Sequence, residues 1–228
     1  MWRLLLTEIE YNRTLLTALW AVYLPLLVIF ALFGGDEISR SQPGVMVLMW
    51  ALGVIFSVFY MMDLSKTRRI RYFLSAPLRP GAVSMAKILI FLAFWGTLSA
   101  GFWTVHLLFH SGLFQWETLY GFGSLTGIAL FIHACYLMAH DVKFTMTRRR
   151  IFKVQAGEFA GSLIPAALLL GFGLVFFAQG VFAPGVRAAG VRFFSSSLGG
   201  LLLLALGLGA ALLEASVFSK RSFFTEQQ

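Results

Sequence analysis

Residues 63–87 read DLSKTRRIRYFLSAPLRPGAVSMAK and form the longest polar interruption in a chain that otherwise consists of apolar runs. The middle of this stretch alternates arginines with apolar side chains, a pattern that predicts a short, basic, amphipathic helix. Pro77 and Pro80 end that helix, because proline lacks a backbone donor and disfavours helical geometry in the residue before it. Two interpretations are open: a loop held against anionic lipid heads by its charges, or a surface that docks a partner.

The composition of the chain predicts a membrane protein. Of its 228 residues, 59% are hydrophobic and only 12% are charged, against roughly 25% charged in soluble proteins. The net charge of +8 does not lead us to expect nucleic acid, since membrane chains gather cations in cytoplasmic loops. A single cysteine, Cys135, lies inside an apolar run, so no disulfide framework is expected.

Six apolar runs are long enough to cross a bilayer, which takes about 20 helical residues. Helices are expected because backbone polar groups in lipid must be satisfied within the segment. The sequence therefore predicts an all-α integral membrane protein with one domain over residues 1–228. Its predicted spans are 15–33, 44–62, 88–109, 119–139, 159–183 and 193–213.

An amphipathic helix is expected at residues 1–13, ahead of the first span. Leu5 and Ile9 fall on its apolar face, whereas Glu8, Glu10 and Arg13 fall largely on its polar face. Such a helix lies in the membrane interface, and the alternative is that these residues are the frayed start of the first span.

The basic residues predict the topology. All 18 lysines and arginines except Arg40, Arg187 and Arg192 fall near the termini, in 63–87, or between the fourth and fifth spans. The positive-inside rule then places both termini and these two loops in the cytoplasm. With six spans, we expect a multi-pass protein of the cytoplasmic (inner) membrane.

The positions of the acids and histidines do not indicate a catalytic or metal-binding site. Glu158 and Glu214 fall at span ends, where neighbouring cations can neutralise them at the cytoplasmic interface. His106 is expected close to the outer surface and His133 nearer the inner leaflet, so they do not share a level. We expect no catalytic residue and no metal site, although a haem-binding or anchoring subunit of a redox enzyme complex remains the alternative function.

Small residues in the fifth predicted span indicate helix packing or a dimer interface. Gly157 and Gly161 have the GxxxG spacing that lets two helices approach closely. Pro165 in the same span and Pro25 in the first remove backbone hydrogen bonds and are expected to kink their helices.

The order of these parts resembles the permease subunit of type-2 ABC exporters. The most specific match is RRIRYFLSAPLRPGAVSMAKIL, residues 68–89: a short helix, a Leu-Ser-x-Pro-like break at 74–77, and a lysine that opens the third span. The interfacial helix, the six spans and the ending VFSKRSFF at 217–224 fit the same plan. The family's loop often carries acids and a Gly-Thr-Leu-Glu-like run where this chain has residues 65–70.

The resemblance implies a permease that exports a hydrophobic or amphipathic substrate with a separate, dimeric cytoplasmic ABC ATPase. ATP and Mg²⁺ would bind that partner and not this chain, which has no P-loop motif. A second permease copy or a paralogue would complete the pore, and membrane lipids would surround it. The 63–87 loop would couple the two subunits through residues Arg68, Arg69, Arg71, Tyr72, Phe73, Leu74 and Pro77. A channel or membrane enzyme that acts alone is a third possibility.

Overall fold

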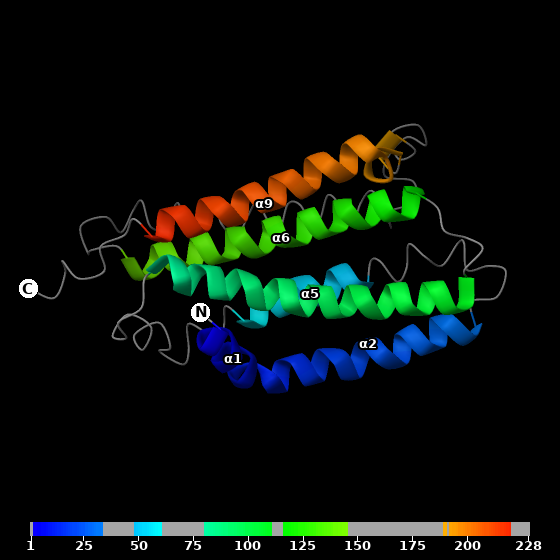
Figure 1. The fold of residues 1–228 in the computed structure, drawn as a ribbon, viewed down its shortest axis with the longest axis horizontal. Helices are drawn as coiled ribbons and strands as arrows, with labels where there is room; N and C mark the ends of the chain where they lie inside the picture. The colour runs from blue at the N-terminus through cyan, green and yellow to red at the C-terminus, as the bar shows by residue number, and fades with distance from the viewer. Residues whose placement is uncertain are drawn as a thin grey trace, which may run out of the picture.

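The computed structural model describes residues 2–33, 48–60, 80–110, 116–145, 189–190 and 192–219. The five helices that Figure 1 labels are α1 (Trp2–Tyr11), α2 (Arg13–Phe33), α5 (Pro80–His110), α6 (Trp116–Thr145) and α9 (Ser197–Ser219). A shorter apolar helix covers Leu48–Tyr60. All regular structure in these ranges is helical, as the apolar runs predict.

Three of these helices are long and apolar enough to cross a membrane. They are Gly81–Val105, Thr118–Met138 and Ser197–Ser216, and a fourth span results if Leu4–Tyr11 and Arg13–Ile29 are taken as one bent segment. Within the described ranges, Leu198, Leu201 and Leu212 of α9 are each more than 60% exposed, as side chains that face lipid are. These features agree with an all-α membrane protein. The predicted span at 159–183 lies outside the described residues.

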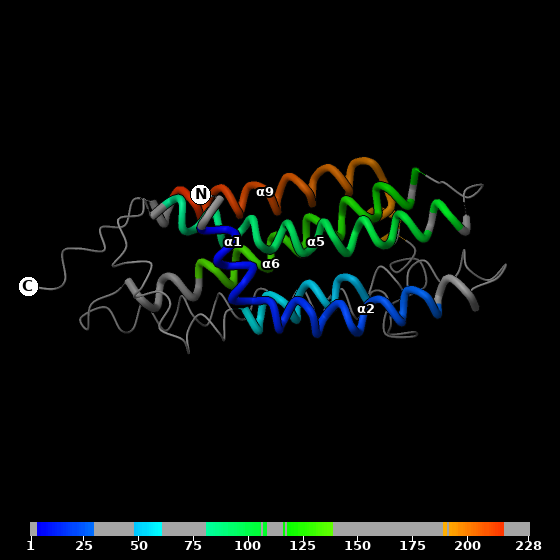
Figure 2. The backbone as a smooth tube through the Cα atoms, turned by 60° about the horizontal axis from the view of Figure 1, so that its bottom comes forward, coloured from blue at the N-terminus to red at the C-terminus, as the bar shows by residue number. Residues whose placement is uncertain are grey.

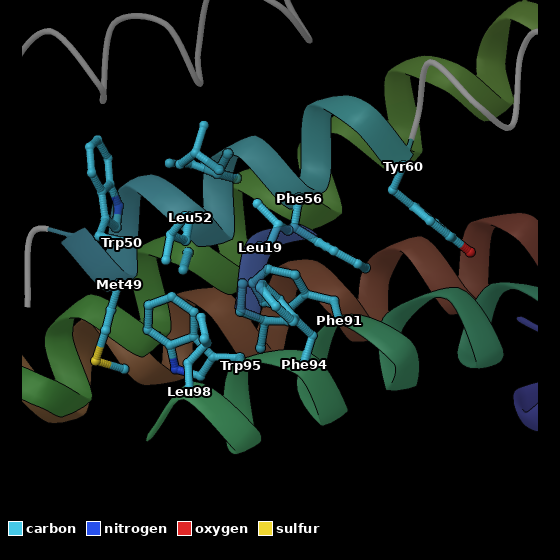
Figure 3. Packing of buried hydrophobic residues seen from close by; sticks show 14 of the residues in the cluster. Leu19, Met49, Trp50, Leu52, Phe56, Tyr60, Phe91, Phe94, Trp95 and Leu98 are labelled. Atoms are coloured by element: carbon cyan, nitrogen blue, oxygen red, sulfur yellow. The ribbon is translucent and has the colours of Figure 1, made fainter. Parts of the chain in front are cut away.

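The long helices lie alongside one another, and α5 is at the centre of the arrangement (Figures 1 and 2). This helix contacts α1, α2, α6 and α9. Its buried face carries Phe91, Phe94, Trp95 and Leu98, which pack against the helix Leu48–Tyr60 (Figure 3). Phe56 stacks on Phe94 with ring centroids 4.7 Å apart, so aromatic contacts hold the centre of the bundle.

The chain bends by 62° between α1 and α2. Asn12 occupies the bend, and its side-chain Nδ2 donates to the carbonyl oxygen of Glu8 at 2.7 Å. Asn12 O in turn accepts from the backbone of Leu16 at 2.9 Å, so the turn keeps its hydrogen bonds. Pro25 lies inside α2, which continues through it as one helix.

Glycines bring α6 and α9 into backbone contact. A Cβ on Gly127 would collide with the carbonyl oxygen of Leu203, and one on Gly207 would collide with that of Gly127. Closer to the helix starts, a Cβ on Gly200 would lie 2.9 Å from the carbonyl oxygen of Tyr120. The paired positions rise together along both helices, so α6 and α9 run parallel, as Figure 1 shows.

Helix α5 begins at Pro80, whereas the predicted third span begins at residue 88. Proline suits a first helical position because the backbone donor it lacks has no partner inside the helix. The last part of the 63–87 stretch is therefore helical. Val83, Ala86 and Lys87 within it are buried, because the first two turns of α5 already pack against other helices.

Candidate functional site

Eight polar side chains are buried together at one end of the bundle, where α1, the start of α5 and the last turns of α6 and α9 lie (Figure 1). We call them the polar cluster. Hydrogen bonds and ring contacts link most of them across five helices. None is more than 3% exposed, and the members are Glu8, Asn12, Ser57, Tyr60, Ser84, Lys87, His133 and Glu214.

His133 of α6 bridges two other helices. Its Nδ1 lies 3.0 Å from the hydroxyl oxygen of Ser57, in the helix Leu48–Tyr60. Its Nε2 lies 3.2 Å from the carbonyl oxygen of Lys87, in α5. The imidazole also stacks on Phe91, with centroids 4.4 Å apart and planes inclined by 14°, so the ring is held on its edges and on its face.

The hydrogen-bond partners of His133 constrain its tautomer. The Lys87 carbonyl can only accept, so Nε2 must carry a proton and donate to it. The Ser57 hydroxyl has one proton, and it lies within reach of both His133 Nδ1 and the Gly53 carbonyl oxygen, the latter at 2.9 Å. With Nε2–H donating to Lys87, a neutral ring has Nδ1 as an acceptor, and Nδ1 then competes with the Gly53 carbonyl oxygen for the Ser57 proton. The Lys87 contact favours the Nε2–H tautomer, whereas the Ser57–Gly53 hydrogen bond favours a ring that donates from Nδ1 to Ser57.

Tyr60 connects this centre to α1. Its hydroxyl donates to Glu8 Oε2 at 2.9 Å, and its ring centroid lies 6.0 Å from that of His133. Asn12 Nδ2 lies 3.5 Å from the same carboxylate oxygen. The placement of Glu8 on an exposed polar face was therefore wrong, because this side chain points into the bundle and accepts hydrogen bonds there.

Helix α9 joins the polar cluster through Glu214. Ser84 of α5 donates to Glu214 Oε1 at 3.5 Å, and Glu214 is completely buried within the candidate span Ser197–Ser216. Glu214 thus lies near the end of that span, as the sequence predicts, but its side chain is buried in the bundle and not exposed to water. Lys87 is buried one turn beyond Ser84 on α5, so a cation belongs to the same cluster.

Burying charged groups in a membrane helix is costly, so such residues mark functional sites. In this chain, the carboxylates lie on the first and last described helices, and the cation and the imidazole lie between them on α5 and α6. Removing one partner from a buried polar network leaves another group desolvated and unpaired. The cluster consequently favours one relative placement of its helices over others.

The residues predicted to couple to an ATPase, Arg68 to Pro77, lie outside the described residues. The same is true of Gly157, Gly161 and Pro165. The structure does place the two ends of this basic segment: Tyr60 before it and Pro80 after it both lie in helices that contribute to the polar cluster.

His133 does not fit the role of an axial haem ligand. Both of its ring nitrogens already have hydrogen-bond partners, and one face of the ring is covered by Phe91. His106 follows Lys87 on α5 by 19 positions, which is about 28 Å of helix. Since His133 contacts the Lys87 carbonyl, these two histidines do not bind a common haem. No group of three metal-ligating side chains occurs in the described ranges.

The polar cluster was not predicted, although the sequence contains a signal for it. Ser57 and Tyr60 are three positions apart, as are Ser84 and Lys87, so each pair shares a helix face. The packing glycines of α6 were also missed: Gly123 and Gly127 have the same GxxxG spacing as Gly157 and Gly161. Both patterns are surrounded by apolar residues, so the sequence alone does not distinguish them from the rest of a membrane span. The contacts between helices identify them.

Comparison of the chain with protein-family models, with curated proteins and with solved structures finds no match.

Proposed function

We propose that this chain is the permease subunit of an ATP-driven exporter, coupled to a separate cytoplasmic ABC ATPase through the basic 63–87 stretch. The observation that carries the proposal is the position of this stretch. The helix before its charged part ends at Tyr60 and the helix after it begins at Pro80, and both helices contribute residues to the polar cluster. A partner that moves this segment therefore acts directly on the ends of two buried helices.

The parallel packing of α6 and α9 supports the six-span topology. Because both helices run in the same direction, the chain between Thr145 and Ala189 has to return from the end of α6 to the start of α9. The predicted span at 159–183 has the length for that return. Six spans and the distribution of cations place both termini on the cytoplasmic side of the inner membrane.

The proposed complex contains a dimeric ATPase, which binds ATP and Mg²⁺, and two permease chains that form the pore between them. Aliphatic and aromatic side chains dominate the described helices. A pathway lined by such residues suits a hydrophobic or amphipathic substrate, because it offers few hydrogen bonds to replace those a polar solute makes with water.

Substituting Phe73 by aspartate tests the coupling role of the 63–87 stretch. A hydrophobic anchor in a partner groove loses its contact when it is replaced by a charge. We expect the variant to insert normally but to lose ATP-dependent transport, with ATP hydrolysis no longer responsive to substrate. The assay uses proteoliposomes that contain this chain and a P-loop ATPase from a neighbouring reading frame.

The matched control is Ser65→Asp, which adds the same charge outside the hydrophobic anchor. We expect Ser65→Asp to retain coupling. Transport by Phe73→Asp at the wild-type rate would contradict docking through this segment, and the absence of any association with an ATPase would contradict the proposed function as a whole.

The redox alternative makes a different prediction for the purified chain. We expect its absorption spectrum to show no Soret band from a haem on His133, since both ring nitrogens of this residue have hydrogen-bond partners. A Soret band that disappears in His133→Ala would instead favour the haem-binding subunit.

A further inference from the structure

We propose that the polar cluster locks the two helices that flank residues 61–79, Leu48–Tyr60 and α5, into one unit with α1 and α6, and that His133 is the positioning residue of this lock. The inference rests on the proposed function, which makes that segment the site of force transmission, and deepens it. It concerns residues inside the bundle, away from any surface that contacts the ATPase.

The first step concerns the chain that enters the segment. Ser57 and Tyr60 lie on the last turn of the helix Leu48–Tyr60, directly before residue 61. Ser57 bonds to His133 Nδ1, and the ring of Tyr60 lies against the same imidazole. This end is therefore attached to α6.

The second step concerns the chain that leaves the segment. Lys87 lies two turns into α5, and its carbonyl oxygen accepts from the opposite nitrogen of His133. Phe91, one turn further along α5, stacks on the imidazole. One side chain of α6 thus holds the helix before the segment with Nδ1 and the helix after it with Nε2.

The third step adds α1. Tyr60 donates to Glu8, so the N-terminal helix is bonded to the same helix end that His133 holds. A displacement of the segment that keeps these bonds must carry α1 and α6 with it. A displacement that breaks them exposes buried polar atoms to an apolar environment, which is unfavourable. The lock consequently converts movement of the segment into movement of helices instead of local distortion.

Variants at His133 separate this positioning role from simple packing. His133→Phe keeps a ring between Phe56 and Phe91 but removes both hydrogen bonds. His133→Gln retains an amide N–H for the Lys87 carbonyl. The control variant Ser124→Ala removes a partly buried hydrogen bond of the same helix, from Ser124 Oγ to the Phe194 carbonyl oxygen at 2.7 Å, outside the polar cluster.

The first readout is coupling in proteoliposomes that contain the partner ATPase. We expect His133→Phe to hydrolyse ATP at the basal rate but to move about tenfold less substrate per ATP, an effect within the range for losing two hydrogen bonds of ordinary strength. We expect His133→Gln to recover most of the coupling and Ser124→Ala to resemble the wild type. Equal coupling in wild type, His133→Phe and Ser57→Ala would overturn the proposal.

The second readout needs no ATPase. Spin labels at Phe59 and Met85, in a Cys135→Ala background, report the distance between the two helix ends in the purified chain. We expect a narrow distribution in the wild type and a broader one in His133→Phe and Ser57→Ala. Unchanged widths would overturn the lock. Narrow wild-type widths that broaden in these variants, without ATP-dependent transport, would preserve it and reject the exporter function.

Discussion

Replacing Gly127 by alanine is expected to separate α6 from α9 and to destabilise the protein by about 3 kcal/mol or more, the upper range for overpacking. The reason is that the added methyl group would meet the Leu203 carbonyl oxygen and the following backbone nitrogen. Backbone atoms within a helix cannot rotate away as a flexible side chain can. The thermal midpoint of the detergent-purified protein measures the effect.

Two glycines provide matched controls for this substitution. A Cβ at Gly209, two residues beyond the contact residue Gly207 on α9, or at Gly96 on α5 meets no atom within 4 Å. Alanine is a better helix former than glycine by up to about 1 kcal/mol, so Gly209→Ala and Gly96→Ala are expected to leave the midpoint unchanged or to raise it. A fall as large as that of Gly127→Ala would contradict the close packing.

The same contact can be tested from the α9 side, at Gly207. A Cβ on Gly207 would collide with the Gly127 carbonyl oxygen, so Gly207→Ala is also expected to be strongly destabilising. Once one methyl group has pushed the helices apart, the second methyl group meets less steric resistance. The stability effects of substitutions at residues in contact are in general not additive. The double variant is therefore expected to lose less stability than the sum of the two single variants.

Replacing Glu8 by alanine is the second substitution for which we expect a large effect. It removes the acceptor of the Tyr60 hydroxyl and a contact of Asn12. A buried group left without its partner costs about 1–3 kcal/mol, and more when the lost partner is charged. We expect α1 to detach from the bundle, with a lower thermal midpoint and faster thiol labelling of a cysteine placed at Leu4.

Glu10 supplies the control, because it belongs to the same helix and is exposed. Glu10→Ala is expected to leave the thermal midpoint and the labelling rate unchanged. Glu8→Gln, whose amide oxygen still accepts from Tyr60, is expected to give values between those of the wild type and Glu8→Ala. If Glu8→Ala and Glu10→Ala behaved alike, the attachment of α1 through the polar cluster would be contradicted.

Much of the helical framework was predictable from composition and run length. Long apolar runs indicate membrane helices because a span needs an uninterrupted apolar segment with internally satisfied backbone groups. The helices α5, α6 and α9 confirm this reasoning for the described chain. Helix ends were harder to predict: α5 begins at Pro80 because its first turns pack against neighbours, although their sequence is polar enough to read as a loop.

The polar cluster and the α6–α9 contact were decided by the tertiary structure. Glu8 has the periodicity of a water-facing residue, and it becomes buried only because the 62° bend at Asn12 directs α1 against the bundle. Likewise, nothing local distinguishes Gly127 and Gly207, which meet another backbone, from Gly209, which meets no neighbour. The sequence by itself determined which segments are apolar helices and where cations gather, since these depend on local composition. Which polar groups are buried, and which glycines are needed, depends on the neighbours that packing supplies.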